Sequence, residues 1–345
     1  MNTQSAKILV TGATGFLGSV LVARLAASGH NQIRCFTRHS SDRTRLEELR
    51  TQYPWLRLES FCGELESRTD AARALDGVEI VYHLAAALRG SPADIFFHTV
   101  VGSKRLLEAM EKSGPRRVVL VSSFGVYGVA ERPRGSIVDE QTPLEQHPER
   151  RDPYSYAKLR QELLFREAHE RQGFELTILR PGVIYGPGGG RFSTRVGLKL
   201  PGLFLHFGGE NVLPLSYVDN CADAIVAAGD HADAAGEVYN VHDDDLPTSR
   251  AYLRRYQSEV GGIRPVRIPY FAAMAMSRMV EKYHRHSKGQ LPAILTPYKS
   301  ASLWRGNGFC NRKLKSLGWR QAVPTEEGLR RTFAAFRAES GNKRA

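Results

Sequence analysis

A phenol and an amine stand four residues apart at Tyr154 and Lys158, within a segment that reads DPYSYAK. Side chains at positions i and i+4 share one face of a helix, so this spacing places the two groups side by side. A free tyrosine has a pKa of about 10 and is a poor base near neutrality. We expect the lysine cation to lower that pKa, which would make Tyr154 a usable general acid or base.

A glycine-rich loop, TGATGFLG, spans Thr11–Gly18 directly after the apolar run KILVT. Glycines permit a tight turn and let the backbone approach a pyrophosphate, which rests on the positive end of the following helix. The loop therefore predicts a dinucleotide site and, with the Tyr–Lys pair, hydride chemistry on an alcohol or ketone. The candidate cofactor residues of the loop are Gly12, Thr14, Gly15, Phe16, Leu17 and Gly18.

The choice of dinucleotide depends on the stretch FTRHS, which ends the second expected strand. An acid usually stands there to bind the ribose diol, but this chain has Thr37 and Arg38. An arginine suits a 2′-phosphate better than a hydroxyl. The sequence therefore predicts NADP(H) as the preferred cofactor. NAD(H) remains the alternative, because a solvated arginine beside a promiscuous pocket would give the same pattern.

Short apolar runs alternate with helical stretches over the first half of the chain. Strands are expected at 7–11, 32–37, 78–85, 117–122 and 175–179, and helices at 16–28, 71–75, 96–112 and 154–172. This rhythm predicts an α/β fold, a Rossmann doubly wound parallel sheet with a smaller C-terminal substrate domain. We expect an NAD(P)-binding domain over 1–180, completed by about 212–242, and a substrate-binding region formed by 181–211 and 243–345.

Composition narrows the class of protein. The 345 residues are 42% hydrophobic and 24% charged, as in a globular protein, with a net charge of +12. The basic residues are scattered and no nucleic-acid module accompanies them, so we expect no nucleic-acid partner. The cysteines and histidines show no metal-ligand spacing, so no metal is expected. The N-terminus leaves no room for a signal peptide and no apolar run could span a bilayer, which predicts a soluble, cytoplasmic protein.

Several motifs together resemble the extended short-chain dehydrogenase/reductases, the superfamily of NAD-dependent epimerase/dehydratases and 3β-hydroxysteroid dehydrogenases. The resemblance runs from residue 7 to about residue 335. The order of a glycine loop followed by Tyr-x-x-x-Lys is highly specific to the superfamily and far less so to any one reaction. The matching segments are 11–18, HLAA at 83–86, SSFGVYG at 122–128, Tyr154 with Lys158, 179–187 and YVD at 217–219.

This resemblance implies roles for individual residues. Tyr154 would be the catalytic acid/base, Lys158 would bind the nicotinamide ribose, and Ser123 would hydrogen-bond the reacting oxygen. Ser123 is preferred to Ser122 because it lies four residues before Tyr127, the spacing found in the family. Further cofactor contacts would come from Leu84, Ala85, Ala86, Glu64, Leu65, Pro181 and Val183, and substrate contacts from Phe124, Tyr185 and Arg191.

Departures from the family pattern bear on the substrate. The residues after Ser123 are Phe124-Gly125, where 4,6-dehydratases have an Asp-Glu pair, so that reaction is disfavoured. The segment VLPLS at 212–216 lacks the arginine that many nucleotide-sugar enzymes carry there. Thr99 stands where the family often has asparagine. These features favour a 3β-hydroxysteroid dehydrogenase-like enzyme that interconverts a secondary alcohol and a ketone, although Arg191 and Arg195 could hold a diphosphate.

Two rival functions remain open, a nucleotide-sugar epimerase and a non-catalytic NAD(P)-binding regulatory protein. The intact Ser123, Tyr154 and Lys158 argue against the second. By the same resemblance we expect a homodimer formed by the helices near 96–112 and 154–172. An apolar stripe of Leu163, Leu164 and Ala168 fits that interface and could equally be core.

The segment from Tyr270 to Lys288 has an apolar half and then a basic half. Such a helix could lie on an anionic membrane surface. We prefer a helix packed over the substrate pocket with solvated charges.

Overall fold

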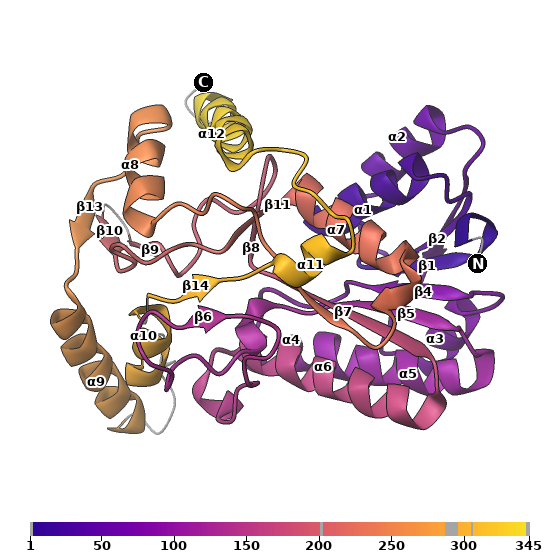
Figure 1. Cartoon of the computed structure of the whole chain (residues 1–345), viewed down its shortest axis with the longest axis horizontal. Helices are drawn as coiled ribbons and strands as arrows, with labels where there is room; N and C mark the ends of the chain where they lie inside the picture. The colour runs from indigo at the N-terminus through magenta and orange to yellow at the C-terminus, as the bar shows by residue number, and fades with distance from the viewer. Residues whose placement is uncertain (1–2, 201–202, 287–295, 305, 343–345) are drawn as a thin grey trace.

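The computed structural model describes residues 3–200, 203–286, 296–304 and 306–342. Its centre is a seven-stranded sheet in the order β12-β7-β5-β4-β1-β2-β3, and every neighbouring pair is parallel (Figure 1). The strands are β1 (Ile8–Thr11), β2 (Gln32–Thr37), β3 (Arg57–Cys62), β4 (Ile80–His83), β5 (Arg117–Val121), β7 (Glu175–Pro181) and β12 (Val238–Val241). This is the Rossmann arrangement that the sequence predicted.

Helices cover both faces of this sheet. One layer packs its apolar side chains against β1 and consists of α1 (Phe16–Ala27), α2 (Thr44–Gln52) and α7 (Val218–Asp230). The opposite layer consists of α3 (Arg68–Ala74), α5 (Gly102–Ser113) and α6 (Pro153–Gln172), seen together below the sheet in Figure 1. The chain order reverses between β1 and β4, so the loops after these two strands border the crevice where such sheets bind ligands.

The expected helix at 96–112 is in fact three segments. A short helix α4 (Pro92–Phe96) leads into a π-helical stretch, Phe97–Val101, which continues into α5. The π turn brings Thr99 into the interior, where its hydroxyl accepts a hydrogen bond from the Ala87 amide at 3.0 Å. A π turn inside a helix is an uncommon feature that often marks a functional region.

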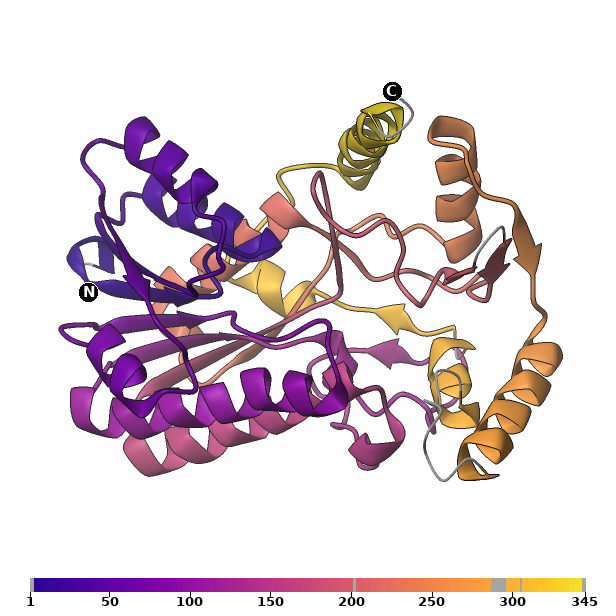
Figure 2. The same cartoon turned by 180° about the vertical axis from the view of Figure 1, so that it is seen from behind.

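A second lobe follows β7 and lies beyond the carboxyl ends of the strands (Figure 2). It holds two parallel strands, β8 (Val183–Tyr185) and β11 (Leu215–Tyr217), and a three-stranded sheet of β9 (Gly197–Leu200), β10 (Leu203–His206) and β13 (Pro265–Arg267). Its helices are α8 (Ser249–Glu259), α9 (Tyr270–His286), α10 (Pro297–Trp304) and α12 (Thr325–Asn342). Small elements β6 (Ile137–Val138), β14 (Gly308–Phe309) and α11 (Arg312–Ser316) connect the two lobes.

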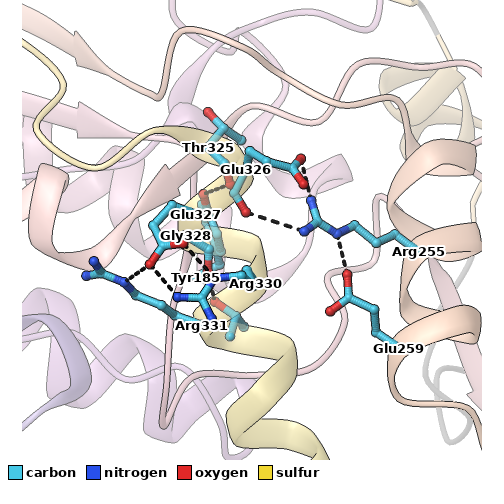
Figure 3. A network of polar contacts seen from close by, with 10 residues as sticks. Tyr185, Arg255, Glu259, Thr325, Glu326, Glu327, Gly328, Arg330 and Arg331 are labelled. Atoms are coloured by element: carbon cyan, nitrogen blue, oxygen red, sulfur yellow. Dashed lines mark hydrogen bonds and ion pairs between the residues drawn. The ribbon is translucent and has the colours of Figure 1, made fainter.

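Ion pairs hold the first turns of the C-terminal helix α12 in place. Arg255 of α8 binds Glu326 at 2.6 Å and Glu259 at 2.6 Å, while Glu327 pairs with the arginines of the next turn (Figure 3). Gly328 sits so close to the lobe that an added Cβ would lie 2.6 Å from the Tyr185 hydroxyl. The start of α12 therefore completes the core of the second lobe.

Candidate active site

The glycine loop has the geometry of a phosphate-binding turn. Gly12 has φ +72°, and its carbonyl accepts a hydrogen bond from the Gly15 amide at 3.0 Å. A Cβ at Gly18 would lie 2.0 Å from the Gly12 carbonyl oxygen, so only glycine lets the helix pack this close. Helix α1 begins at Phe16 with no side-chain cap on Gly15, which leaves the helix N-terminus for an anion. The residues present fit a dinucleotide pyrophosphate.

The other predicted cofactor residues lie in loops at the same ends of the strands. Arg38 follows β2 and is exposed, Glu64 and Leu65 follow β3, and Leu84, Ala85 and Ala86 follow β4. Leu65 is buried, whereas Glu64 is exposed. Pro181 ends β7 and Val183 begins β8. The structure adds Arg45 to the residues near this site. Its guanidinium donates a hydrogen bond to the Ser19 hydroxyl of α1 at 3.0 Å, which places a cation near the glycine loop that the sequence did not predict.

Ser123 and Tyr154 are brought together by β5 and α6. Asp152 caps α6 by accepting the Ser155 amide at 3.0 Å, and Pro153 occupies the first turn, so Tyr154 projects from the start of the helix. Ser123 follows β5, and its hydroxyl lies close enough to the Tyr154 phenol to lower the pKa of that phenol. Ser122 is buried and donates to Glu162 at 2.6 Å. This contact supports the choice of Ser123 over Ser122.

The protonation of Tyr154 differs from the sequence expectation. Burial raises the pKa of Tyr154, the nearby Ser123 hydroxyl lowers it, and the charge of Asp152 raises it further. The expected lowering by Lys158 is not seen here, because the lysine amine is engaged by Val121 and Gln161. In this structure Tyr154 is therefore a neutral phenol near pH 7, poised to donate a proton.

Lys158 lies at the head of a buried polar network. Its Nζ donates to the Val121 carbonyl at 2.6 Å and to the Gln161 side-chain oxygen. Burial lowers the pKa of Lys158 to about 7, although the charge of Glu162 raises it. The Gln161 amide nitrogen in turn donates to the Ala85 carbonyl at 3.0 Å and to Ser103 at 2.8 Å. Gln161 thus links the lysine to the loop after β4.

His83 extends this network to the glycine loop. Its ring nitrogens lie 2.8 Å from the Thr11 hydroxyl and 2.9 Å from the Ser103 hydroxyl, and it is fully buried. Burial lowers the pKa of His83 to about 3, with a further contribution from Lys158, so the ring is neutral. Thr11 also accepts the Ala85 amide at 3.2 Å. The histidine therefore has a structural role, because it joins the end of β4 to the glycine loop that follows β1.

A buried ion pair joins α6, the helix that carries Tyr154 and Lys158, to the central sheet. Arg180 of β7 and Glu162 of α6 are both almost fully buried and form two hydrogen bonds, one of 3.1 Å. The Arg180 guanidinium also lies 4.6 Å from the centre of the Tyr127 ring, whose hydroxyl donates to Asn240 at 2.6 Å. These contacts connect α6 to β7 and β12. Sequence reasoning assigned no role to any of the four residues.

The three predicted substrate residues, Phe124, Tyr185 and Arg191, each contact other side chains of the protein. Phe124 is buried and stacks on Phe309, with ring centres 5.4 Å apart. The Tyr185 hydroxyl donates to Asp243 at 2.9 Å beneath α12. Arg191 contacts the end of α12 through Glu339 at 3.2 Å and Ser340 at 3.1 Å. These contacts account for Tyr185 and Arg191 within the second lobe, and their substrate roles stay predictions.

Across the part of the chain that the structure describes, no group of three or more His, Cys, Asp or Glu side chains could hold a metal ion. Within the same ranges no helix is long and apolar enough to cross a membrane.

Comparison with protein families matches residues 8–241 to the NAD dependent epimerase/dehydratase family. The chain belongs to this family. Among curated relatives of this epimerase/dehydratase-family enzyme, 3beta-hydroxysteroid-dehydrogenase/decarboxylase isoform 1 of Arabidopsis thaliana is 27% identical, with 81% of this chain and 67% of that protein covered. UDP-glucose 4-epimerase of Vibrio cholerae is also 27% identical, with 95% of this chain and 95% of that protein covered.

Some relatives of the enzyme match only in part. The chain spans about half (52%) of the sterol demethylase protein B of Methylococcus capsulatus, at 34% identity. The fold resembles the crystal structure of the Thermus thermophilus UDP-glucose 4-epimerase in complex with NAD, with a TM-score of 0.69, 23% identity, and 96% of this chain and 99% of that chain covered. Family membership makes this chain an NAD(P)-dependent enzyme of the dehydrogenase or epimerase type.

If Gln161 holds the Lys158 amine, its replacement should move the pH profile of the enzyme. An acceptor on the ammonium favours the charged form, so Gln161→Leu should lower the pKa of Lys158 and Gln161→Glu should raise it. We expect the limb of kcat/KM that falls with rising pH to shift by roughly one unit, down in the first variant and up in the second.

The control for this experiment is Gln172→Leu, at the far end of the same helix, where the amide donates to the Leu107 carbonyl. A profile in either Gln161 variant that coincides with the wild-type profile would contradict the assignment.

Proposed function

We propose that this enzyme interconverts a secondary alcohol and a ketone by hydride transfer, in the manner of a 3β-hydroxysteroid dehydrogenase. The observation that carries the proposal is that Ser123, at the carboxyl end of β5, lies close enough to the Tyr154 phenol to influence its pKa, with Lys158 buried one helical turn away. Ser123 would hold the substrate oxygen while Tyr154 exchanges a proton with it. A nicotinamide bound at the adjacent loops would supply or accept the hydride.

Support for a steroid-like alcohol comes from two sources. The curated relatives include a 3beta-hydroxysteroid-dehydrogenase/decarboxylase that matches 81% of this chain. The loop after Ser123 is apolar and aromatic, with Phe124 and Val126 buried and with Phe124-Gly125 where 4,6-dehydratases have an Asp-Glu pair. Turnover of a hydroxysteroid or related cyclic alcohol should change absorbance at the reduced-nicotinamide band. A panel of such alcohols and ketones with no absorbance change for any member would refute the proposal.

A nucleotide-sugar epimerase is the second candidate, and Arg195 favours it. This half-buried arginine lies within electrostatic reach of Asp152 and Arg151 at the start of the catalytic helix. Burial lowers the pKa of Arg195 to about 10, the mark of a desolvated cation that would gain from an anionic ligand. One curated relative, which matches over 95% of both chains, is a UDP-glucose 4-epimerase. An epimerase would convert a UDP-sugar with no net change in nicotinamide absorbance, which separates the two reactions.

We further propose that NADP(H) is preferred to NAD(H). Arg38 is exposed at the end of β2, beside Arg43 and Arg45 and with no acid at the strand end. A charge-assisted arginine–phosphate contact is worth roughly 1.5–3 kcal/mol, about a 10- to 150-fold preference. Titration of NADPH and NADH into wild type and Arg38→Ala should show a selective loss of NADPH affinity in the variant.

Arg57→Ala is the control for that titration, because this exposed arginine begins β3 at the opposite end of the sheet. Equal affinities of the wild type for the two cofactors would contradict the preference.

We also propose a homodimer through α5 and α6. The structure separates the expected stripe, because Leu163 is exposed, Leu164 is half-buried and Ala168 lies in the core. Phe97, which precedes α5, is also exposed and adds apolar surface near the same helices. Light scattering should give about twice the 38.4 kDa monomer mass, and Leu163→Glu should shift it to the monomer. A wild-type mass of one monomer at micromolar concentration would count against the dimer.

A further inference from the structure

Helix α9 carries an apolar stripe on its outward face. Phe271 and Met279 are 77% and 71% exposed, and Tyr283 is 59% exposed. Together with Ala275 they recur every four residues, so they form a stripe that winds gradually along the outward side of the helix. Exposed apolar side chains concentrate around this helix, including also Val266, Tyr270 and Met276. A contiguous patch of this kind marks an interaction surface and is rare on a surface that faces only water.

The opposite face of α9 packs against α10. Ala273 and Ser277 are fully buried, and the Ser277 hydroxyl lies 2.5 Å from the Ser300 hydroxyl of α10. Both views show α9 at the outer edge of the second lobe with α10 on its inner side (Figures 1 and 2). The helix is therefore fixed to the lobe by small residues and turns its large apolar residues outward. This contradicts the expectation that its apolar half packs over the substrate pocket.

The charges beside the stripe are almost all positive. Arg278 and Lys282 are exposed and lie along one side of the stripe, and Arg267 is exposed just before the helix. Between 261 and 286 the acidic residue is Glu281, against Arg264, Arg267, Arg278, Lys282 and Arg285. Lys288, which the sequence grouped with them, lies outside the described residues. An apolar stripe flanked by cations is complementary to a surface with an apolar interior and anionic groups at its rim.

We propose that α9 lies flat on an anionic lipid bilayer, with Phe271, Met279 and Tyr283 inserted at the boundary of headgroups and acyl chains. The helix, about 25 Å long at 1.5 Å per residue, would lie in the plane of the surface. Arg278 and Lys282 would then meet lipid phosphates while their aliphatic stems extend along the apolar stripe. The aromatic Tyr283 suits the same depth, because its ring is apolar and its hydroxyl polar.

A bilayer fits this face better than a second copy of the chain. Two-fold association would place the same patch on both partners and so bring Arg278 and Lys282 against their own equivalents. Like charges facing each other disfavour such a contact. An anionic surface reverses the sign of this interaction.

The test is co-flotation of the purified protein with lipid vesicles. Wild type should float with vesicles of phosphatidylcholine and phosphatidylglycerol, and at least roughly tenfold less with phosphatidylcholine alone. Phe271→Ser/Met279→Ser/Tyr283→Ser should abolish flotation, since each removes apolar surface from the boundary. Arg278→Glu/Lys282→Glu should weaken it by roughly 30-fold or more, because each charge near an anionic surface contributes about fivefold.

Matched control variants distinguish binding through α9 from non-specific binding of the protein to lipid. Trp55→Ser/Ile137→Ser removes two other exposed apolar side chains, and Arg134→Glu/Arg337→Glu reverses two other exposed arginines. Both controls should float like wild type. The serine variant must also keep the wild-type circular dichroism spectrum, and Phe271→Trp gives an independent readout. Its added emission should shift to shorter wavelength with anionic vesicles.

The proposal is overturned if wild type stays in the lipid-free fraction with both vesicles, or if the control variants lose binding as fully as the α9 variants. An unchanged Phe271→Trp emission overturns it as well. A wild type that ignores vesicles but becomes monomeric when the stripe is changed to serine would assign the face to a second copy instead.

Discussion

Replacing Tyr154 with phenylalanine is expected to lower kcat at least ~10²-fold, or about 2.7 kcal/mol in the barrier. The variant keeps the ring and removes the hydroxyl, which lies near Ser123 and would protonate a substrate oxygen. Affinity for the dinucleotide should change little, because the glycine loop and the loop after β4 are untouched. Steady-state turnover and cofactor titration on the same preparations measure both quantities.

Tyr156→Phe is the matched control, since it makes the same chemical change two residues further along α6. The Tyr156 ring is half-buried and lies 6.2 Å from the Phe96 ring, away from Ser123. This variant should retain wild-type turnover. Near-normal kcat in Tyr154→Phe would refute the acid/base assignment.

Removing the carboxylate of Glu162 is expected to destabilise the fold by roughly 3–5 kcal/mol, because it leaves a buried cation without its partner. Arg180 and Glu162 have 2% and 0% side-chain exposure, so solvent cannot replace the lost contact. Ser122, which donates to the same carboxylate, loses its acceptor as well. Denaturant unfolding of Glu162→Ala against wild type gives the difference directly.

Two further variants show whether the buried charge is the cause. Glu167→Ala removes an exposed carboxylate from the same helix and should change stability by no more than about 0.5 kcal/mol. Glu162→Met/Arg180→Met removes both charges and should recover part of the loss. A Glu162→Ala variant within about 1 kcal/mol of wild type would show that the pair is not a stabilising centre of the fold.

The sequence predicted the central strands well because they are buried on both faces and therefore read as apolar runs. Edge strand β3 and helix α2 were missed. The strand alternates exposed and covered residues, as in Arg57, Leu58 and Glu59, and the helix is almost wholly polar. The π-helical stretch at Phe97–Val101 was missed for a different reason. One extra residue per turn leaves no mark in an apolar pattern that is otherwise helical.

The candidate site could be proposed from the sequence where chemistry fixes both residue type and spacing, as in the glycine loop, Tyr154 and Lys158. Its supporting network was not. Gln161, Glu162 and Arg180 are polar residues that read as solvated helix and strand positions, yet all three are buried. Their burial depends on partners from β4, β5 and β7 that are distant in the chain. The same network holds the Lys158 amine against Val121 and Gln161, so the lysine does not offset the burial that raises the pKa of Tyr154.

The packing of α12 against the second lobe affects the order in which the protein can fold during synthesis. The parallel sheet is complete once β12 has emerged from the ribosome, but the second lobe still lacks the segment that closes it. Asn220 exchanges two hydrogen bonds with the Val323 backbone, of 2.8 and 2.9 Å, and Gly328 packs against Tyr185. Until those residues are released, the nascent chain has a formed nucleotide fold and an apolar lobe open to water. This interval is when chaperones would be needed most.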